Sequence, residues 1–191
     1  MNQPEQLPNI PNMNITLVPT PKKVTKAAVN AAQGGSLFLE PDYVPTNMEL
    51  ACPHPTFFTG LEWIKESQSL TAKAVQTGWR FFAVDGEEVL CDVYITMKNE
   101  FASSTQNGPI IEAFVDSLHR LEAAVTEGVY TLNLLRIPGL YLELVWLRGE
   151  NGQDWLVSIG SFYDDTITRF EMYTPEDMYT RVAAILENHV Y

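Results

Sequence analysis

One hairpin decides the fold of this chain: residues 79–96 read WRFFAVDGEEVLCDVYIT. Asp85-Gly86 between two apolar runs is a strong short-range signal for a tight turn, because glycine accepts the positive φ that such turns need. In the second run, apolar residues alternate with polar ones such as Asp92, which is the period of a strand with one buried face. We expect an antiparallel hairpin with one face in water and one buried face made by Val89, Cys91, Val93 and Ile95.

Helices are predicted on both sides of this hairpin in the sequence. Residues 59–62 read TGLE, a capping-box spelling that opens a helix expected to reach residue 77, before Gly78. Residues 174–177 read TPED and cap a last helix that ends near Asn188. Gly108-Pro109 opens the most regular helix, at 109–127, whose apolar residues recur at helical spacing: Ile111, Phe114, Leu118, Leu121 and Val125.

Strand candidates fill the region between these two last helices, at 130–137, 140–148, 154–160 and 166–173. Short turns such as Pro138-Gly139 join them, and hairpin-linked strands form antiparallel sheets. The predicted fold class is α+β: a mainly antiparallel sheet of about six strands with helices packed on one face, in the order α-β-β-α-β-β-β-β-α.

The first 58 residues differ from the rest because they hold nine of the 12 prolines. We expect two units, with 1–58 as a proline-rich N-terminal arm or subdomain and 59–191 as the α+β body. Residues 1–12 are expected to be disordered. Strands at 15–18 and 36–39 around a helix at 22–33 make a small β-α-β arm, and 41–58 are expected to form a loop.

The charge of the chain excludes several classes of partner. The 191 residues include 12 basic and 24 acidic ones, for a net charge of −12, and residues 59–191 alone carry −11. Such a charge repels phosphate backbones and anionic lipids, so we expect no nucleic-acid partner and no membrane partner. An acidic surface serves solubility or attracts a basic partner.

The cysteines and the N-terminus indicate the compartment. Two cysteines are too few for a disulfide framework, and the N-terminus lacks the basic and apolar segments of a signal peptide. No apolar run in the sequence is long enough for a membrane span. We therefore expect a cytoplasmic protein.

No common signature of catalysis or cofactor binding occurs in the sequence. The phosphate-binding patterns GxxxxGKS/T and GxGxxG are absent, as is the serine-hydrolase pattern GxSxG, and no cofactor is predicted. Cys52 and His54 place a thiol next to an imidazole and are a candidate nucleophile or metal site. The alternative is a rigid loop in which Cys52 is accessible to reagents, whereas Cys91 points inward and is inert.

Two acidic groups are candidates for a metal ion. Asp164 and Asp165 lie at a predicted turn, and paired carboxylates suit Ca²⁺ or Mg²⁺. A second group crowds the hairpin: Asp85, Glu87, Glu88 and Asp92. Neither group has the spacing of an EF-hand, and turns favour Asp for backbone reasons alone.

Aromatic residues gather around the first helix and strand of the body, at Phe57, Phe58, Trp63, Trp79, Phe81 and Phe82. Alternate strand residues face opposite ways, so Trp79 and Phe81 do not share a face with Phe82. Either both faces of the sheet are covered, one of them by the N-terminal arm, or one aromatic row meets a partner. In the second case Trp63, Trp79, Phe81 and Phe82 bind another polypeptide or a second copy of the chain.

These features predict a non-catalytic protein-binding or regulatory module, because recognisable chemistry is missing and aromatic residues are in surplus. Two alternatives stay open. One is a small hydrolase-type enzyme with a site of dispersed Asp, Glu and His side chains. The other is a cation- or ligand-binding domain that uses a cleft between arm and body.

Overall fold

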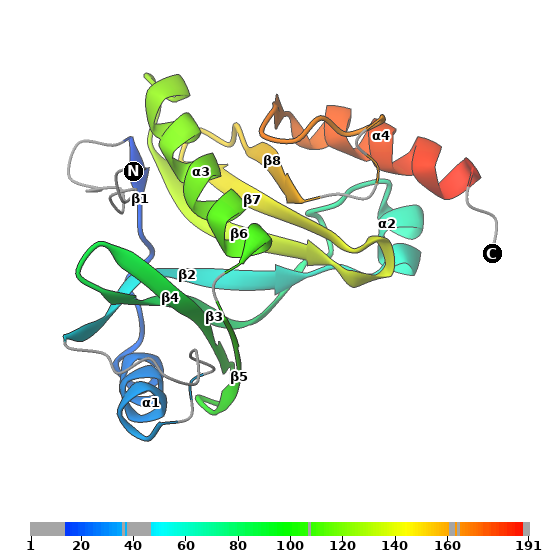
Figure 1. Ribbon diagram of the computed structural model, residues 1–191. Helices are drawn as coiled ribbons and strands as arrows, with labels where there is room; N and C mark the ends of the chain where they lie inside the picture. Colours follow the sequence, from blue (N-terminus) through cyan, green and yellow to red (C-terminus); the bar gives the residue numbers. More distant parts are fainter. Residues whose placement is uncertain are drawn as a thin grey trace.

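The computed structural model describes residues 14–35, 37, 47–106, 108–160, 163 and 165–188. The helices among them are α1 (Lys22–Gln33), α2 (Leu61–Ser67), α3 (Pro109–Ala124), α4 (Pro175–Asn188) and the short 3-10 helix η2 (Pro138–Leu140). The strands are β1 (Ile15–Thr16), β2 (Met48–Phe58), β3 (Val75–Asp85), β4 (Glu88–Thr96), β5 (Phe101–Gln106), β6 (Tyr130–Ile137), β7 (Leu142–Gly149), β8 (Trp155–Gly160) and β9 (Met172–Tyr173). This is an α+β fold, as predicted (Figure 1).

The described strands form one sheet in the order β5-β4-β3-β2-β6-β7-β8-β9, and β1 pairs with β6 off this path. Neighbours along the path are antiparallel, as expected, except that β2 and β6 are parallel. The pairing of β2 with β6 is short, with Thr56–Phe58 against Leu134–Arg136. The sheet therefore has two parts, β5-β4-β3-β2 and β6-β7-β8-β9, which meet at a narrow seam (Figure 1).

The hairpin predicted at 79–96 is confirmed. Strand β3 pairs with β4, and Asp85 faces Glu88 across a turn in which Gly86 has a φ of 63°. The inward orientation of Cys91 is confirmed as well, since this side chain is 0 % exposed. The expected wet face is wrong, because Asp92 is only 4 % exposed.

Helix α3 covers one face of the sheet and spans both of its parts (Figure 1). Its predicted apolar stripe is confirmed, as the residues from Ile111 to Leu121 at that spacing are buried in one cluster. The same cluster contains Phe82 from one part of the sheet and Val145 from the other. The packing of α3 thus fastens the two parts together.

The opposite face is covered by α1, α2 and α4. Val24 and Ala28 of α1 pack on Trp79 and Phe81 of β3. Helices α2 and α4 pack on the other part of the sheet, in a cluster that includes β7 and β8. Because strand side chains alternate, these helices and α3 lie on opposite sides. Helices therefore cover both faces, where one face was predicted.

The stretch 41–58, predicted to be a loop, contains the long strand β2 from residue 48 onward. Its prolines favoured the loop, because proline has no N–H for a sheet ladder. The strand accommodates Pro53 with a bulge between Ala51 and His54, where Cys52 has a φ of 48°. β2 lies between β3 and β6, so the stretch 1–58 contributes a central strand to the sheet of the body.

The helix predicted at 59–77 is shorter than expected, because α2 ends at Ser67. Gly60 and not Thr59 is its N-cap, and Gln68 stops it with a left-handed φ of 51°. The Oγ of Ser69 accepts hydrogen bonds from the backbone N–H groups of Thr71 and Ala72 in the turn that follows. Strand β3 begins at residue 75.

Other boundaries also differ from those predicted. Strand β5 was not predicted, and the strand expected at 166–173 is reduced to β9. The strand expected at 36–39, apart from Leu37, and the segment 1–12 lie outside the described residues.

Candidate functional site

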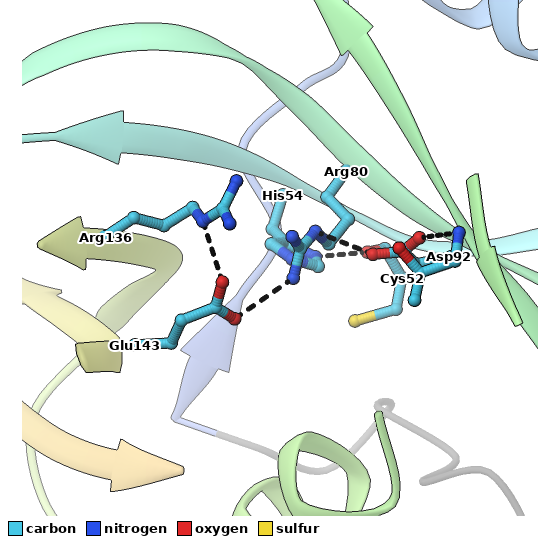
Figure 2. A network of polar contacts seen from close by, with 7 residues as sticks. Cys52, His54, Arg80, Asp92, Arg136 and Glu143 are labelled. Carbon is cyan, nitrogen blue, oxygen red and sulfur yellow. Dashed lines mark hydrogen bonds and ion pairs between the residues drawn. The ribbon is translucent and has the colours of Figure 1, made fainter. Parts of the chain in front are cut away.

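Four charged side chains from four strands meet on the α3 face of the sheet (Figure 2). Arg80 lies two residues before Phe82 on β3, so it points to the same face as that core residue. Arg136 on β6, Glu143 on β7 and Asp92 on β4 reach the same place from their own strands. Arg136 belongs to the seam between β2 and β6, and the other three side chains meet it from β3, β4 and β7.

Arg80 is the centre of this network. Its Nε lies 3.1 Å from Oδ2 of Asp92, and its Nη1 donates to Oε2 of Glu143 at 3.4 Å. Arg136 contributes an Nε atom 2.7 Å from Oε1 of Glu143. The backbone N–H of Thr105 on β5 donates to Oδ1 of Asp92 at 2.7 Å. The side chains of Arg80, Asp92 and Glu143 are 10, 5 and 15 % exposed, so the network is largely removed from water.

A pocket of about 270 Å³ opens onto the network. Its polar wall consists of the four charged residues and Thr105, and its apolar wall is the start of α3. The lining residues are Arg80, Asp92, Thr105, Gly108, Pro109, Ile110, Ile111, Arg136 and Glu143. Pockets for drug-sized ligands measure about 300–1,000 Å³, so this one suits a small molecule or a single chemical group.

Hydrogen-bond donors outnumber free acceptors in this pocket. Both carboxylate oxygens of Glu143 have arginine partners, and those of Asp92 have Arg80 and a backbone N–H. Each guanidinium carries five N–H donors. Within the described part of the chain, the contacts use Nε and Nη1 of Arg80 and Nε of Arg136, and neither Nε is aligned for a hydrogen bond. The other N–H groups are left for water or a ligand.

The N-terminal end of α3 adds further donors. The N–H of Glu112 makes the first bond of the helix, to the carbonyl of Gly108. The N–H groups of Ile110 and Ile111 precede it, and Gly108 has no side chain to receive them. The helix start also carries a partial positive charge. Guanidinium and helix donors together make the pocket suited to an anionic group.

His54 lies beside the network but is closed off from solvent (Figure 2). Its ring stacks on Phe114 with centroids 4.8 Å apart, and its Nδ1 donates to the carbonyl of Cys52 at 2.7 Å. Burial lowers the pKa of His54 to about 3, with the charge of Arg80 acting in the same direction. The Nε2 atom has no partner among the described residues. The imidazole is therefore neutral at physiological pH and packs as part of the buried core.

The predicted reactivity of Cys52 is not supported by its position. Cys52 is in β2 and 8 % exposed, whereas the expectation placed it in an open loop. Burial raises the pKa of its thiol to about 12, and burial also raises that of Cys91 to about 12. A thiol with such a pKa is a poor nucleophile and a poor metal ligand at neutral pH.

The aromatic residues of the predicted binding surface are separated from one another. Trp79 and Phe81 are buried under α1, and Phe82 is buried under α3 in the cluster around Phe114. Trp63 on α2 is the one of the four that reaches the surface, with 38 % of its area exposed.

The predicted metal pair is only partly described, so it stays a prediction. Asp164 lies outside the described residues, and Asp165 is exposed. In the described ranges, no three His, Cys, Asp or Glu side chains lie close enough to hold a metal ion. Asp92 of the acidic hairpin group points away from the turn and into the arginine network.

Sequence reasoning missed Arg80, Arg136 and Glu143, and it placed Asp92 on a wet face. One signal was present: each is a charged residue inside an apolar strand run, at an inward position by alternation. A buried charge is costly unless it is paired, so such residues predict partners on neighbouring strands. The strand order needed to identify those partners comes only from the tertiary structure.

Comparison of the chain with protein-family models, curated proteins and solved structures finds no match. A separate property concerns the helices: across the described ranges, none is both long and apolar enough to cross a membrane.

Proposed function

We propose that this protein is a non-catalytic binding module of regulatory type, and that the pocket at the start of α3 binds a small anionic group. One observation carries the proposal. Arg80 is nine-tenths buried, lines the pocket and retains N–H donors that no described residue accepts. A buried donor without an acceptor is unfavourable, and an anion in the pocket supplies the acceptor.

The electrostatics of the pocket support an anion over a cation. The four charged side chains sum to zero, since two are basic and two acidic, and the start of α3 adds partial positive charge. Asp92 and Glu143 are already ion-paired with arginine, so they offer little to a cation. The remaining arginine donors are placed by these same carboxylates, which is the arrangement of a preformed binding site.

The surrounding side chains favour binding over catalysis. Cys52 and Cys91 are buried with raised pKa values, and the pKa of buried His54 is lowered to about 3. A general base works best with a pKa near the working pH and within reach of substrate. None of these three residues lines the pocket, so they supply no nucleophile or base to a bound molecule.

The proposal is tested by titrating the protein with acetate, phosphate and sulfate while recording amide NMR shifts of Ile110 and Ile111. The variant is Arg136→Gln, because this arginine is 41 % exposed and its loss leaves Arg80 paired with both carboxylates. The matched control is Arg120→Gln on the outer face of α3, which removes an exposed pair with Asp116.

At least one anion is expected to give saturable shifts, with affinity lowered about tenfold, or 1.4 kcal/mol, in Arg136→Gln and unchanged in Arg120→Gln. A small ion of few atoms binds weakly, with a dissociation constant on the order of 1 mM or more. If no anion gives a saturable response at on the order of 50 mM, the pocket is not an anion site.

The proposal also includes the binding of a protein partner, for which Trp63 is the candidate anchor. This side chain is 38 % exposed and packs edge-on against Phe58, with ring centroids 5.6 Å apart. Exposed, partly supported tryptophan is a frequent anchor in protein interfaces. If a second copy of the chain binds there, Trp63→Ala will weaken self-association in sedimentation analysis by about 2 kcal/mol. A wild-type chain that stays monomeric at high concentration removes the homodimer from consideration.

A further inference from the structure

We infer that the pocket at the start of α3 selects a monoanionic carboxylate attached to a short apolar group, and discriminates against phosphate dianions. The inference rests on the proposed anion site and specifies its ligand. Its basis is the composition of the pocket wall: two arginines, two carboxylates and an apolar helix start.

The arginine donors match a carboxylate in shape. A guanidinium presents parallel N–H groups in one plane, and a carboxylate accepts two of them at once. In the network Nε of Arg136 lies 2.7 Å from Oε1 of Glu143 without the alignment of a hydrogen bond, and the terminal Nη groups of Arg136, which have no partner among the described residues, are left for a second acid. A bound carboxylate therefore extends a pattern that the protein already contains, in which one acid is shared by two arginines.

The two acidic side chains limit the charge that the pocket accepts. Asp92 and Glu143 lie in the wall and are 5 and 15 % exposed, so water screens them poorly. With their charges cancelling those of the arginines, only the helix start is left to balance a ligand. One negative charge is tolerated there, whereas two charges repel both carboxylates at short range. The net −11 of residues 59–191 acts against a dianion as well.

The apolar wall indicates what is attached to the carboxylate. Pro109, Ile110 and Ile111 line the pocket, and Ile110 is 54 % exposed although it is a large apolar residue. An alkyl group attached to the bound carboxylate, and extending from the arginines toward α3, would cover this side chain and remove apolar surface from water. A volume of about 270 Å³ limits that group to a few carbon atoms.

The same chemistry occurs in a free short-chain carboxylic acid and in the C-terminal apolar residue of a polypeptide. The probes are therefore isobutyrate, its neutral analogue isobutyramide, inorganic phosphate at pH 7.5, and a short neutral peptide ending in valine with a free or an amidated C-terminus. Binding is measured by calorimetry and by the amide shifts of Ile110 and Ile111, with wild type, Arg136→Gln, Glu143→Gln and the control Arg120→Gln.

Isobutyrate is expected to bind at least ten times more tightly than phosphate, isobutyramide not to bind, and Arg136→Gln to weaken isobutyrate about tenfold. Because Glu143→Gln removes one charge that repels an anion, it is expected to reduce the ratio of the affinity for isobutyrate to the affinity for phosphate. Tighter binding of the free-acid peptide than of isobutyrate, lost on amidation, assigns the source to polypeptide termini. The reverse order assigns it to small acids.

Phosphate that binds as tightly as isobutyrate, with the same dependence on Arg136, overturns this inference and leaves the anion site standing. Isobutyramide that binds as well as isobutyrate overturns it too, because the pocket then recognises the alkyl group alone. Failure of every probe, in a protein whose amide spectrum shows it folded, removes both the carboxylate inference and the anion site.

Discussion

Two arginines in this protein lie at the same distance from an aspartate carboxylate in different surroundings, and replacing each by methionine tests how deeply the central network is buried. Arg80 Nε lies 3.1 Å from Oδ2 of Asp92, and Arg120 Nε lies 3.1 Å from Oδ2 of Asp116. The first pair is 10 and 5 % exposed, and the second is 59 and 38 % exposed. Methionine keeps the apolar stem of arginine and removes the charge.

The expected costs follow from these exposures. Arg80→Met leaves the buried carboxylate of Asp92 without a cation and removes one of the two arginine partners of Glu143. Breaking a buried ion pair in this way costs about 3–5 kcal/mol. Arg120→Met removes an exposed helical pair, worth about 0.5 kcal/mol. It also removes the stacking of Arg120 on Phe170, at 4.6 Å, worth about 0.5–1 kcal/mol more at such a site.

Urea denaturation measures the costs of Arg80→Met and Arg120→Met as changes in the free energy of unfolding. The melting temperature of Arg80→Met is expected to fall by roughly 6–20 °C. The double variant Arg80→Met/Asp92→Asn removes both charges and is expected to recover part of the loss, because Arg136 still pairs with Glu143. If Arg80→Met costs no more than Arg120→Met, the central network is hydrated and the argument for a buried donor set fails.

Three further outcomes are expected. The pKa of His54 is about 3 in the folded protein and near 6.5 in the unfolded chain. As the pH falls, the unfolded chain therefore binds this proton at a higher pH than the folded protein does. Stability should fall as pH drops below about 6.5 by up to 1.4 kcal/mol per unit, and His54→Gln, followed by denaturation against pH, should lose this slope. Cys52 and Cys91 should both resist a soluble thiol reagent until urea is added. Rapid labelling of Cys52 in the native protein would show that Cys52 is not buried in β2. Leu118→Ala should cost about 2–5 kcal/mol in urea, because Leu118 is 3 % exposed, and a loss below about 0.5 would mean that α3 is turned the other way.

Three elements with short-range signals were predicted well, although the helix opened by the capping-box spelling at 59–62 was predicted too long. The hairpin at Asp85-Gly86 forms, since its turn needs only local backbone freedom. α4 begins at Pro175, where the N–H of Asp177 donates to Oγ1 of Thr174 at 3.1 Å. The spacing of Ile111 to Leu121 identified the buried face of α3 without knowledge of what it packs on. In each case the interacting groups are close in sequence.

Elements stabilised by distant partners were predicted poorly. β2 contains two prolines, which argue against a strand, yet it pairs on both sides with β3 and β6. Its neighbours and the bulge at Cys52 outweigh the local preference of proline. Trp79 and Phe81 had two possible coverings, and only the position of α1 shows that the chain covers them itself.

By itself the sequence determined the α+β class, the main hairpin, the face of α3 and the acidic charge, because composition and local periodicity specify these. The tertiary structure alone decided the site. Arg80 and Glu143 are 63 residues apart and lie on strands separated by β2 and β6. Their contact depends on the short seam between the two parts of the sheet, where both side chains reach the start of α3. No pattern along the chain specifies that strand order, because it is set by the packing of all the strands together.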